Sequence, residues 1–241
     1  MSEPKIVSHE EWRAARIALL AKEKEITRAR DRVLQETREL PYERVEKDYR
    51  FIGPEGEVGL IDLFGDQPQL FVHHMMWLDS DESCPSCSMF YDSLGRREHF
   101  EAANTAVVFV AEAPFASIER MRRRLGWEHP IYATVGSDFS DDYHSRIDRS
   151  RGVTEYNYRD MADAGFDGDL PAESTFLRHG DEVLHKYSAY ARGLELVSNY
   201  FMVLDMTPLG RQEEEGVQAW VRHNDSYGVE HAHQHVHVHA H

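Results

Sequence analysis

The stretch Gln69-Leu70-Phe71-Val72-His73-His74-Met75-Met76-Trp77 is followed, after a short acidic loop, by Cys84-Pro85-Ser86-Cys87-Ser88-Met89-Phe90-Tyr91. The first segment is mostly apolar and does not alternate, which is typical of a central strand covered on both faces. The second segment predicts a helix through Leu94 in which Pro85 takes the first position, where a missing N–H is tolerated. The sequence therefore places a CxxC pair between a buried strand and the start of a helix.

Strands and helices alternate on both sides of this pair. Such alternation indicates a mixed α/β sheet flanked by helices, and a CxxC directly after the first central strand is the layout of a thioredoxin-like fold. A long irregular insertion is predicted at 136–170, where the periodicity is weak. The other predicted elements are strands at 49–52, 58–64, 105–110 and 131–135, a hairpin at 174–187, and helices at 114–125 and 194–204.

A long N-terminal helix is predicted from Ser8 to Leu40. Ser8 and Glu11 fit a capping box, and neither glycine nor proline occurs before Pro41, which ends the helix. Apolar residues recur at seven-residue spacing but form only a narrow ridge between charged faces. This pattern favours a helical arm that packs on the body of the protein or on a second copy, and one expectation is a homodimer through this helix.

The composition excludes several classes of protein. The chain of 241 residues carries 27 Lys+Arg against 43 Asp+Glu, a formal charge of −16, which argues against binding to nucleic acid. Two cysteines cannot crosslink a small secreted scaffold, and no apolar run approaches the ~18 residues that span a bilayer. No apolar leader segment follows Met1. We therefore expect a cytoplasmic protein that binds neither nucleic acid nor membrane.

The C-terminal end is rich in histidine, with six of the 15 histidines in its last eleven residues. Imidazoles on a flexible segment chelate nickel, copper or zinc, and a purification tag is the competing interpretation. We therefore divide the chain into a helical arm at 1–45, a thioredoxin-like domain at 46–215 and a polar, His-rich tail at 216–241. The metal-binding candidates in the tail are His231, His233, His235, His237, His239 and His241.

The CxxC pair is predicted to be a dithiol redox centre. A cysteine at a helix N-terminus faces unpaired N–H groups and the positive end of the helix dipole, which stabilise its thiolate. In this prediction Cys84 attacks a disulfide, and Cys87, one turn further on, resolves the mixed disulfide. The expected activity is thiol–disulfide exchange without a cofactor, on a disulfide-containing protein or a small thiol substrate.

Three other interpretations of the pair stay open. A zinc site would need two further ligands and no second CxxC exists, whereas a copper site would combine the thiolates with an imidazole from His74 or the tail. Both cysteines could also be inert buried residues. Asp79, Asp81 and Glu82 shortly precede Cys84 and oppose thiolate formation, so the acidic loop and the helix terminus act in opposite directions.

Seven blocks occur in order along the chain: Val45–Phe51, Cys84–Ser88, Gly126–Trp127, Gly136–Phe139, Tyr156–Tyr158, Tyr187–Gly193 and Leu204–Arg211. Together they resemble a bacterial family of unknown function, described as predicted dithiol–disulfide oxidoreductases with a thioredoxin-like fold. The resemblance covers residues 5–215 and implies a redox role for Cys84 and Cys87, with His74 as the matching strand histidine. The residues expected beside the redox centre are Pro85, Ser86, His74 and Trp77.

Two related patterns do not fit. The peroxiredoxin motif needs Thr three residues and Pro seven residues before its cysteine, whereas Asp81 and Trp77 hold those places before Cys84. Thioredoxins place a cis-proline directly before the strand that faces the CxxC pair, where it shapes the substrate groove. With that strand expected to begin near Ser174, Pro171 stands too early, and the substrate groove is expected to differ.

Two further groups are weaker candidates. Asp138, Asp141, Asp142 and His144 gather in the insertion at 136–170, where a solvated acidic loop is the leading interpretation and a cation site the alternative. Arg192 fits a structural salt bridge as well as it fits contact with an anionic substrate.

Overall fold

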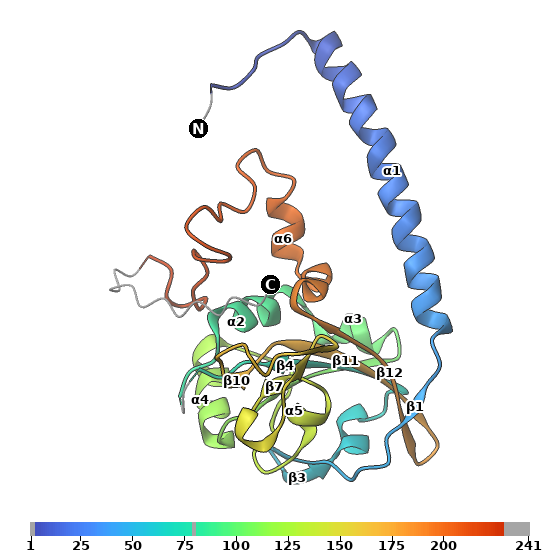
Figure 1. The fold of residues 1–241 in the computed structure, drawn as a ribbon, viewed down its shortest axis with the longest axis vertical. Coiled ribbons are helices and arrows are strands. Elements are labelled where there is room, and N and C mark those ends of the chain that lie inside the picture. The colour runs from blue at the N-terminus through green and yellow to red at the C-terminus, as the bar shows by residue number, and fades with distance from the viewer. Residues whose placement is uncertain (1–2, 79–80, 229–241) are drawn as a thin grey trace. The chain divides into compact units, whose positions relative to one another are not determined.

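The computed structural model describes residues 3–78 and 81–228, and Figure 1 shows their fold as a ribbon. The chain divides into two compact units, the first ending at Pro41 and the second beginning at Tyr42. The first unit consists of one helix with its flanking residues. The second unit holds every strand among the described residues and both cysteines, and it includes β1 (Glu43–Arg44), which pairs with β12 of the sheet. Residues 43 and 44 therefore belong to the sheet rather than to the helical arm.

Helix α1 (His9–Glu39) has the capping box predicted from the sequence. The Ser8 hydroxyl accepts from the Glu11 N–H at 3.3 Å, and Glu11 Oε2 accepts from the Ser8 N–H at 3.0 Å. The helix ends with Leu40 as its C-cap before Pro41, so its predicted boundaries are confirmed. None of its residues is buried. Among the described helices, α1 included, none is long and apolar enough to cross a membrane.

The second unit is built on an eight-stranded mixed sheet in the order β1-β12-β11-β4-β5-β6-β2-β3. Strands β4, β5 and β6 run parallel, and the others pair with antiparallel neighbours. A parallel β4–α2–β5 unit with an antiparallel hairpin beside β4 is the thioredoxin-like arrangement expected from the sequence. The strands of this sheet are β1, β2 (Arg50–Gly53), β3 (Gly56–Gly59), β4 (Gln69–Met75), β5 (Thr105–Ala111), β6 (Ile131–Ala133), β11 (Ala172–His179) and β12 (Glu182–Tyr190).

Helices cover both faces of this sheet, and Figure 1 shows α2 and α5 on opposite faces. Val107 and Phe109 of β5 pack in the core beneath α2 and α4, whereas Val108 and Val110 pack in the core with Phe139 of α5. Both faces of the central strands are therefore apolar, which explains the lack of alternation in the sequence. The helices of the second unit are α2 (Pro85–Ser93), α3 (Arg97–Glu101), α4 (Phe115–Leu125), α5 (Phe139–Asp142), α6 (Asn199–Leu204) and the 3-10 helices η1 (Leu60–Phe64), η2 (Arg149–Arg151) and η3 (Ala191–Val197).

The insertion at 136–170 is not irregular, and that prediction is wrong. It contains α5, η2 and four strands of two residues each, which pair as β7 with β10 and β8 with β9. Strands this short give no detectable periodicity in the sequence, because a period of two needs at least four residues to show. These strands are β7 (Arg146–Ile147), β8 (Glu155–Tyr156), β9 (Arg159–Asp160) and β10 (Gly168–Asp169).

Two other elements differ from their predictions. The segment 60–64 forms the 3-10 helix η1 instead of continuing a strand, because the Asp62 carboxylate accepts the Gly59 N–H at 2.8 Å and turns the chain. The helix predicted at 194–204 is divided at Ser198 into η3 and α6. Apolar spacing alone does not reveal such breaks.

Strand β11 begins at Ala172, two residues earlier than predicted. Pro171 therefore stands directly before the strand, and the statement that it stands too early is wrong. Glu173, the residue before the predicted start of the strand, is charged, and a charged residue at that place indicates a loop. In the structure Glu173 is 5% exposed and pairs across the sheet with His73.

The C-terminal segment beyond α6, residues 205–228, contains no helix or strand but is packed against the body of the unit. Val221 lies in an apolar cluster with Phe90 of α2 and Phe201 of α6. His223 is 7% exposed. Figure 1 shows this segment, in orange and red, beside α2. The described part of the expected tail, 216–228, therefore contributes to the core around α2.

Candidate functional site

The CxxC pair lies at the start of α2, after the loop that follows β4. Cys84 is the N-cap of α2, and Pro85 takes the first helical position. The Cys84 N–H donates to the Met76 carbonyl at 3.0 Å, which fixes the helix start to the end of β4. Both thiols are free, with Cys84 partly exposed and Cys87 only 2% exposed. Cys84 is therefore the more accessible residue of the pair, and Cys87 the sheltered one.

The two sulfurs have opposite tendencies to ionise. A hydrogen bond from the Cys87 thiol lowers the pKa of Cys84 to about 6 despite its burial, and contacts with the N–H groups of Cys87 and Ser86 act in the same direction. The same hydrogen bond, with burial, raises the pKa of Cys87. Near neutral pH, Cys84 is therefore mostly a thiolate and Cys87 a thiol.

Asp169 is a carboxylate of the redox centre that the sequence did not single out. The N–H of Met76 donates to Cys87 Sγ at 3.3 Å, and the N–H of the next residue, Trp77, donates to Asp169 Oδ2 at 3.3 Å. Burial raises the pKa of Asp169 to about 7, and its negative charge helps to raise the pKa of Cys87. A partly buried carboxyl group that titrates near neutral pH therefore interacts with the resolving thiol.

Asp169 is the first member of a series of neighbouring polar groups at the carboxyl ends of the parallel strands. In the small β7–β10 sheet it pairs with Arg146, whose Nη1 lies 3.2 Å from Glu112 Oε1. Glu112 Oε2 in turn accepts from the Thr134 hydroxyl at 2.8 Å. Glu112 directly follows β5 and Thr134 directly follows β6, so the series follows the edge where α/β proteins commonly place their sites.

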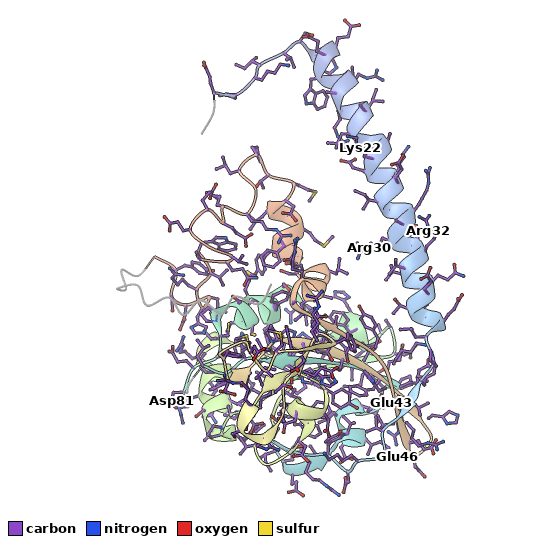
Figure 2. The ribbon with its side chains drawn as sticks, in the orientation of Figure 1. Lys22, Arg30, Arg32, Glu43, Glu46 and Asp81 are labelled. Atoms are coloured by element: carbon purple, nitrogen blue, oxygen red, sulfur yellow. The ribbon has the colours of Figure 1, made fainter. Side chains whose placement is uncertain are left out.

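The acidic loop before the CxxC pair is paired with helix α4. Asp81 forms an ion pair with Arg120, and Glu82 Oε1 lies 3.2 Å from Arg124 Nη1. Figure 2 shows Asp81 at the surface of the second unit, and such exposed pairs add little stability. The arginines do compensate part of the negative charge of the loop. This weakens the effect of the loop, which is to disfavour ionisation of the Cys84 thiol. Asp79 lies outside the described residues.

The structure does not bring His74 together with the thiols. Its ring stacks on Phe139 of α5, with 5.2 Å between ring centroids, on the sheet face opposite α2. Its two ring nitrogens are each 3.0 Å from a hydroxyl oxygen, that of Ser174 and that of Ser145. Burial lowers the pKa of His74 to about 3, so it is a neutral, hydrogen-bonded core residue.

His73 is the strand histidine on the side of α2. Its ring stacks on Phe90 of α2 at 5.7 Å, and its Nδ1 lies 3.5 Å from Glu173 Oε1. Burial raises the pKa of Glu173. The two strand histidines therefore lie on opposite faces, as the two-residue period of a strand requires.

The remaining predicted candidates form ion pairs. Those in the insertion at 136–170 are bound by basic residues or, for His144, by a glutamate, and Arg192 binds a glutamate one turn along η3. These contacts support a structural role. The pairs are Asp138 and Asp142 with Lys47 at 2.7 Å each, Asp141 with Arg151 at 2.8 Å, His144 with Glu155 at 3.6 Å and Arg192 with Glu195 at 3.4 Å.

Metal binding stays a prediction. Within residues 3–78 and 81–228, no group of three or more His, Cys, Asp or Glu residues is arranged to hold a metal ion. The predicted tail ligands His231, His233, His235, His237, His239 and His241 lie outside the described residues.

Sequence reasoning missed Asp169, Arg146 and Glu112. Asp169 and Arg146 come from strands of two residues inside the insertion, and Glu112 follows β5 as a lone acidic residue. No spacing joins them along the chain. The only available signal was the position of Glu112 at the end of a predicted central strand, where sites in parallel sheets gather.

The structure has distant similarity to several solved structures. The peroxiredoxin PrxQ of Xylella fastidiosa is 11% identical, with a TM-score of 0.45, over 67% of this chain and 94% of that chain. A peroxiredoxin Q of Xanthomonas campestris is 10% identical, with a TM-score of 0.44, over 66% and 91% of the two chains. The mitochondrial 2-Cys peroxiredoxin of Plasmodium falciparum is 13% identical, with a TM-score of 0.42, over 68% and 86%.

Sequence comparison gives a closer assignment. None of the curated proteins matches the chain. One family model does match, that of a bacterial protein of unknown function, DUF899, over residues 1–227. This match covers all but 14 of the 241 residues, since 241 − 227 = 14. The chain therefore belongs to the bacterial DUF899 family, as the sequence blocks around the CPSC pair predicted.

Proposed function

We propose that the protein is a thiol–disulfide oxidoreductase in which Cys84 is the nucleophile and Cys87 the resolving thiol. The observation that carries the proposal is the asymmetry of the pair. Cys84 is partly exposed at the N-terminus of α2 and has a lowered pKa, whereas Cys87 is buried and has a raised pKa. A nucleophile must be ionised and reachable, and a resolving thiol must stay inactive until the mixed disulfide forms.

In the first step the Cys84 thiolate attacks one sulfur of a substrate disulfide. A bond forms between Cys84 Sγ and that sulfur, the substrate S–S bond breaks, and the other substrate sulfur leaves as a thiolate. The N–H groups at the start of α2 stabilise the attacking anion. A disulfide-containing protein or a small disulfide fits this step.

In the second step Cys87 resolves the mixed disulfide. Its proton passes to the Asp169 carboxylate, its sulfur attacks Cys84 Sγ, and the second substrate sulfur leaves as a thiolate. The protein is oxidised by two electrons to the Cys84–Cys87 disulfide, and the substrate disulfide becomes two thiols. A carboxyl group with a pKa of about 7 is suited to this role, because it exchanges protons readily near neutral pH.

Native alkylation across pH tests the proposal. We expect Cys84 to react with iodoacetamide along a titration curve with its midpoint near pH 6, while Cys87 stays unmodified, as followed by mass spectrometry. The midpoint is the informative quantity. At pH 7 a thiol of pKa 6 is ~90% ionised against ~3% for an ordinary thiol, but its weaker nucleophilicity offsets roughly tenfold of this advantage.

Two variants of Cys87 provide a matched control. Cys87→Ala removes the donor to Cys84 and should move the midpoint upward by about one pH unit or more, whereas Cys87→Ser keeps a donor and should move it less. A wild-type midpoint in the ordinary range, at about pH 8.5, would contradict the proposal.

Self-association through α1 is a separate prediction. The helix presents exposed apolar side chains at seven-residue spacing, among them Leu19, Ile26 and Val33. If a second copy covers this ridge, the double variant Leu19→Lys and Ile26→Lys should weaken dimerisation at least about 100-fold, since each buried aliphatic side chain contributes ~1.5–3 kcal/mol. Sedimentation measures it, with Glu25→Lys on the charged face as control. A monomeric wild-type protein would refute the prediction.

A further inference from the structure

The peptide unit that joins Ser83 to Cys84 is held at both of its polar atoms. The Cys84 N–H donates to the Met76 carbonyl at 3.0 Å, and the Ser83 carbonyl lies 3.0 Å from His223 Nε2. Ser83 itself is fully buried. Because this peptide plane directly precedes the Cα atom of Cys84, its orientation helps to set the direction in which the thiol points. His223, 140 positions beyond Ser83 in the chain, thus contacts the peptide unit that precedes the proposed nucleophile.

The contacts of His223 define its protonation state. A carbonyl oxygen only accepts, so Nε2 carries a hydrogen and donates to Ser83. A guanidinium only donates, so Nδ1 is unprotonated and accepts from Arg124 Nη2 at 3.1 Å. The imidazole is therefore neutral with its proton on Nε2. A second proton, on Nδ1, would face the N–H group of Arg124 and break that contact.

Charged groups from four parts of the chain surround this imidazole. Arg124 of α4 binds Asp225 of the same C-terminal segment at 2.9 Å and Glu82 of the acidic loop at 3.2 Å. Asp92 of α2 also lies close enough for the charge of His223 to lower the pKa of its carboxyl group. Burial is the main cause that lowers the pKa of His223, and Arg124 adds to it, whereas the Ser83 carbonyl, Glu82 and Asp225 act against it. The neutral form consequently prevails at neutral pH.

The segment that carries His223 is anchored on both sides of the histidine. Val221 packs against Met89 and Phe90 of α2. The Asn224 side chain donates to the Leu125 carbonyl at the end of α4, at 3.1 Å. Figure 1 shows this segment close to the start of α2. His223 is therefore fixed relative to both helices that border the loop before Cys84.

We propose that His223 is a positioning residue for the Cys84 thiol. Its neutral imidazole, held by Arg124, fixes the Ser83–Cys84 peptide, and protonation at Nδ1 breaks the contact with Arg124, so that the ring is no longer held in place against this peptide. The proposal rests on the redox function proposed above, and it adds acid sensitivity to that function. Acidification then removes reactivity in two ways, by protonating the thiolate and by releasing the peptide. The C-terminal segment, outside the CxxC motif, becomes part of the site.

The first test compares the pH profile of Cys84 alkylation in three full-length proteins. In the wild type the acid limb of this profile, the fall of the alkylation rate with decreasing pH, should be steeper than one ionisation allows. Two protonations, of Cys84 and of His223, each lower the rate. His223→Gln keeps an N–H donor for Ser83 and an acceptor for Arg124 but does not titrate, so it should react normally at pH 7.5 and show a one-proton acid limb. His223→Ala should react about three- to tenfold more slowly at pH 7.5, the ratio that one ordinary hydrogen bond supports.

A second measurement does not depend on reactivity. Amide hydrogen exchange of the Cys84 N–H, compared at equal pH, should be faster in His223→Ala than in the wild type and near the wild-type rate in His223→Gln. The matched control is His129→Gln. His129 is also buried and lies 2.9 Å from a backbone carbonyl oxygen, that of Gly95, but its bonds do not reach Cys84. The His129→Gln variant should leave both the steep acid limb of the alkylation profile and the exchange rate of the Cys84 N–H unchanged. Circular dichroism reports whether each protein is folded at each pH.

The outcomes separate the two proposals. If His223→Ala leaves both the acid limb and the exchange of Cys84 as in the wild type, the positioning role is refuted. If Cys84 is unreactive in every protein but its exchange still responds to His223→Ala, the redox function fails and the contact with the peptide stands. Changes of equal size in His129→Gln would reveal a general loss of stability and would also overturn the proposal.

Discussion

Replacing Cys84 with serine is expected to abolish reduction of a model disulfide. The hydroxyl of serine stays protonated at neutral pH, so the group that attacks the disulfide is lost, and the turnover should fall at least about a thousandfold, to background. The measurement is release of thiol from a small aromatic disulfide by the reduced protein. Because Cys84 is only partly buried and packs at the margin of the apolar core, and because serine differs from cysteine by one atom, the substitution should not disturb the fold.

Cys87→Ser is the companion variant and should give a different result. The Cys84 thiolate still attacks, but no second thiol releases the substrate, so the protein should accumulate one covalently bound substrate thiol per chain, visible as a mass increase. This trapped adduct should be lost on adding a reducing agent. If Cys84→Ser retains turnover, or if Cys87→Ser shows no adduct with any disulfide, the assigned roles are wrong.

Replacing Asp169 with asparagine is expected to slow the resolving step. Asparagine still accepts the N–H of Trp77 but cannot take a proton from Cys87. Decay of the mixed disulfide, followed by rapid acid quench, should slow about 10- to 100-fold at pH 7.5, at the low end of what a general base contributes. In the wild type the decay rate should rise through an inflection near pH 7, where Asp169 titrates. That inflection should be absent from the variant.

The same substitution should change the pH dependence of stability. Asp169 has a raised pKa in the folded state, so its contribution is complete below its unfolded pKa of about 4 and is lost as the pH rises through about 7. Above pH 7 the variant should therefore be more stable than the wild type, by on the order of 3 kcal/mol in urea unfolding. Asp167→Asn is the control, because this neighbouring carboxylate is exposed and paired with Arg149. A stability difference that does not change between pH 4 and pH 8 would contradict the raised pKa of Asp169.

Local features of the chain were predictable where one physical cause acts within a few residues. Ser8 and Glu11 predicted the start of α1, and Gly126, with φ of +70°, ends α4 as a left-handed residue should. The mostly apolar run after Gln69 predicted β4, and the proline after Cys84 predicted the start of α2. These features also predicted the thioredoxin-like fold, because a strand, the CxxC pair and a helix follow one another closely in the sequence.

The errors occurred where a distant partner changes the meaning of a residue. Glu173 indicates a loop when read alone, but it is a strand residue because it is buried against His73 of β4. His74 matched the strand histidine of the family blocks, yet it faces α5 and is hydrogen-bonded by Ser174 and Ser145. The period of two along a strand says that His73 and His74 face opposite ways, but not which of the two faces α2.

The fold class and the pair of thiols follow from the sequence alone, because the order of elements and the position of a CxxC at a helix start are local properties. The tertiary structure decided what surrounds those thiols. It brings Asp169 of β10 to Cys87, pairs the acidic loop with the arginines of α4, and places His223 against the carbonyl of Ser83. The physical reason is that pKa values and backbone orientation depend on charges and donors within a few ångströms, and folding supplies these from residues that are far apart in sequence.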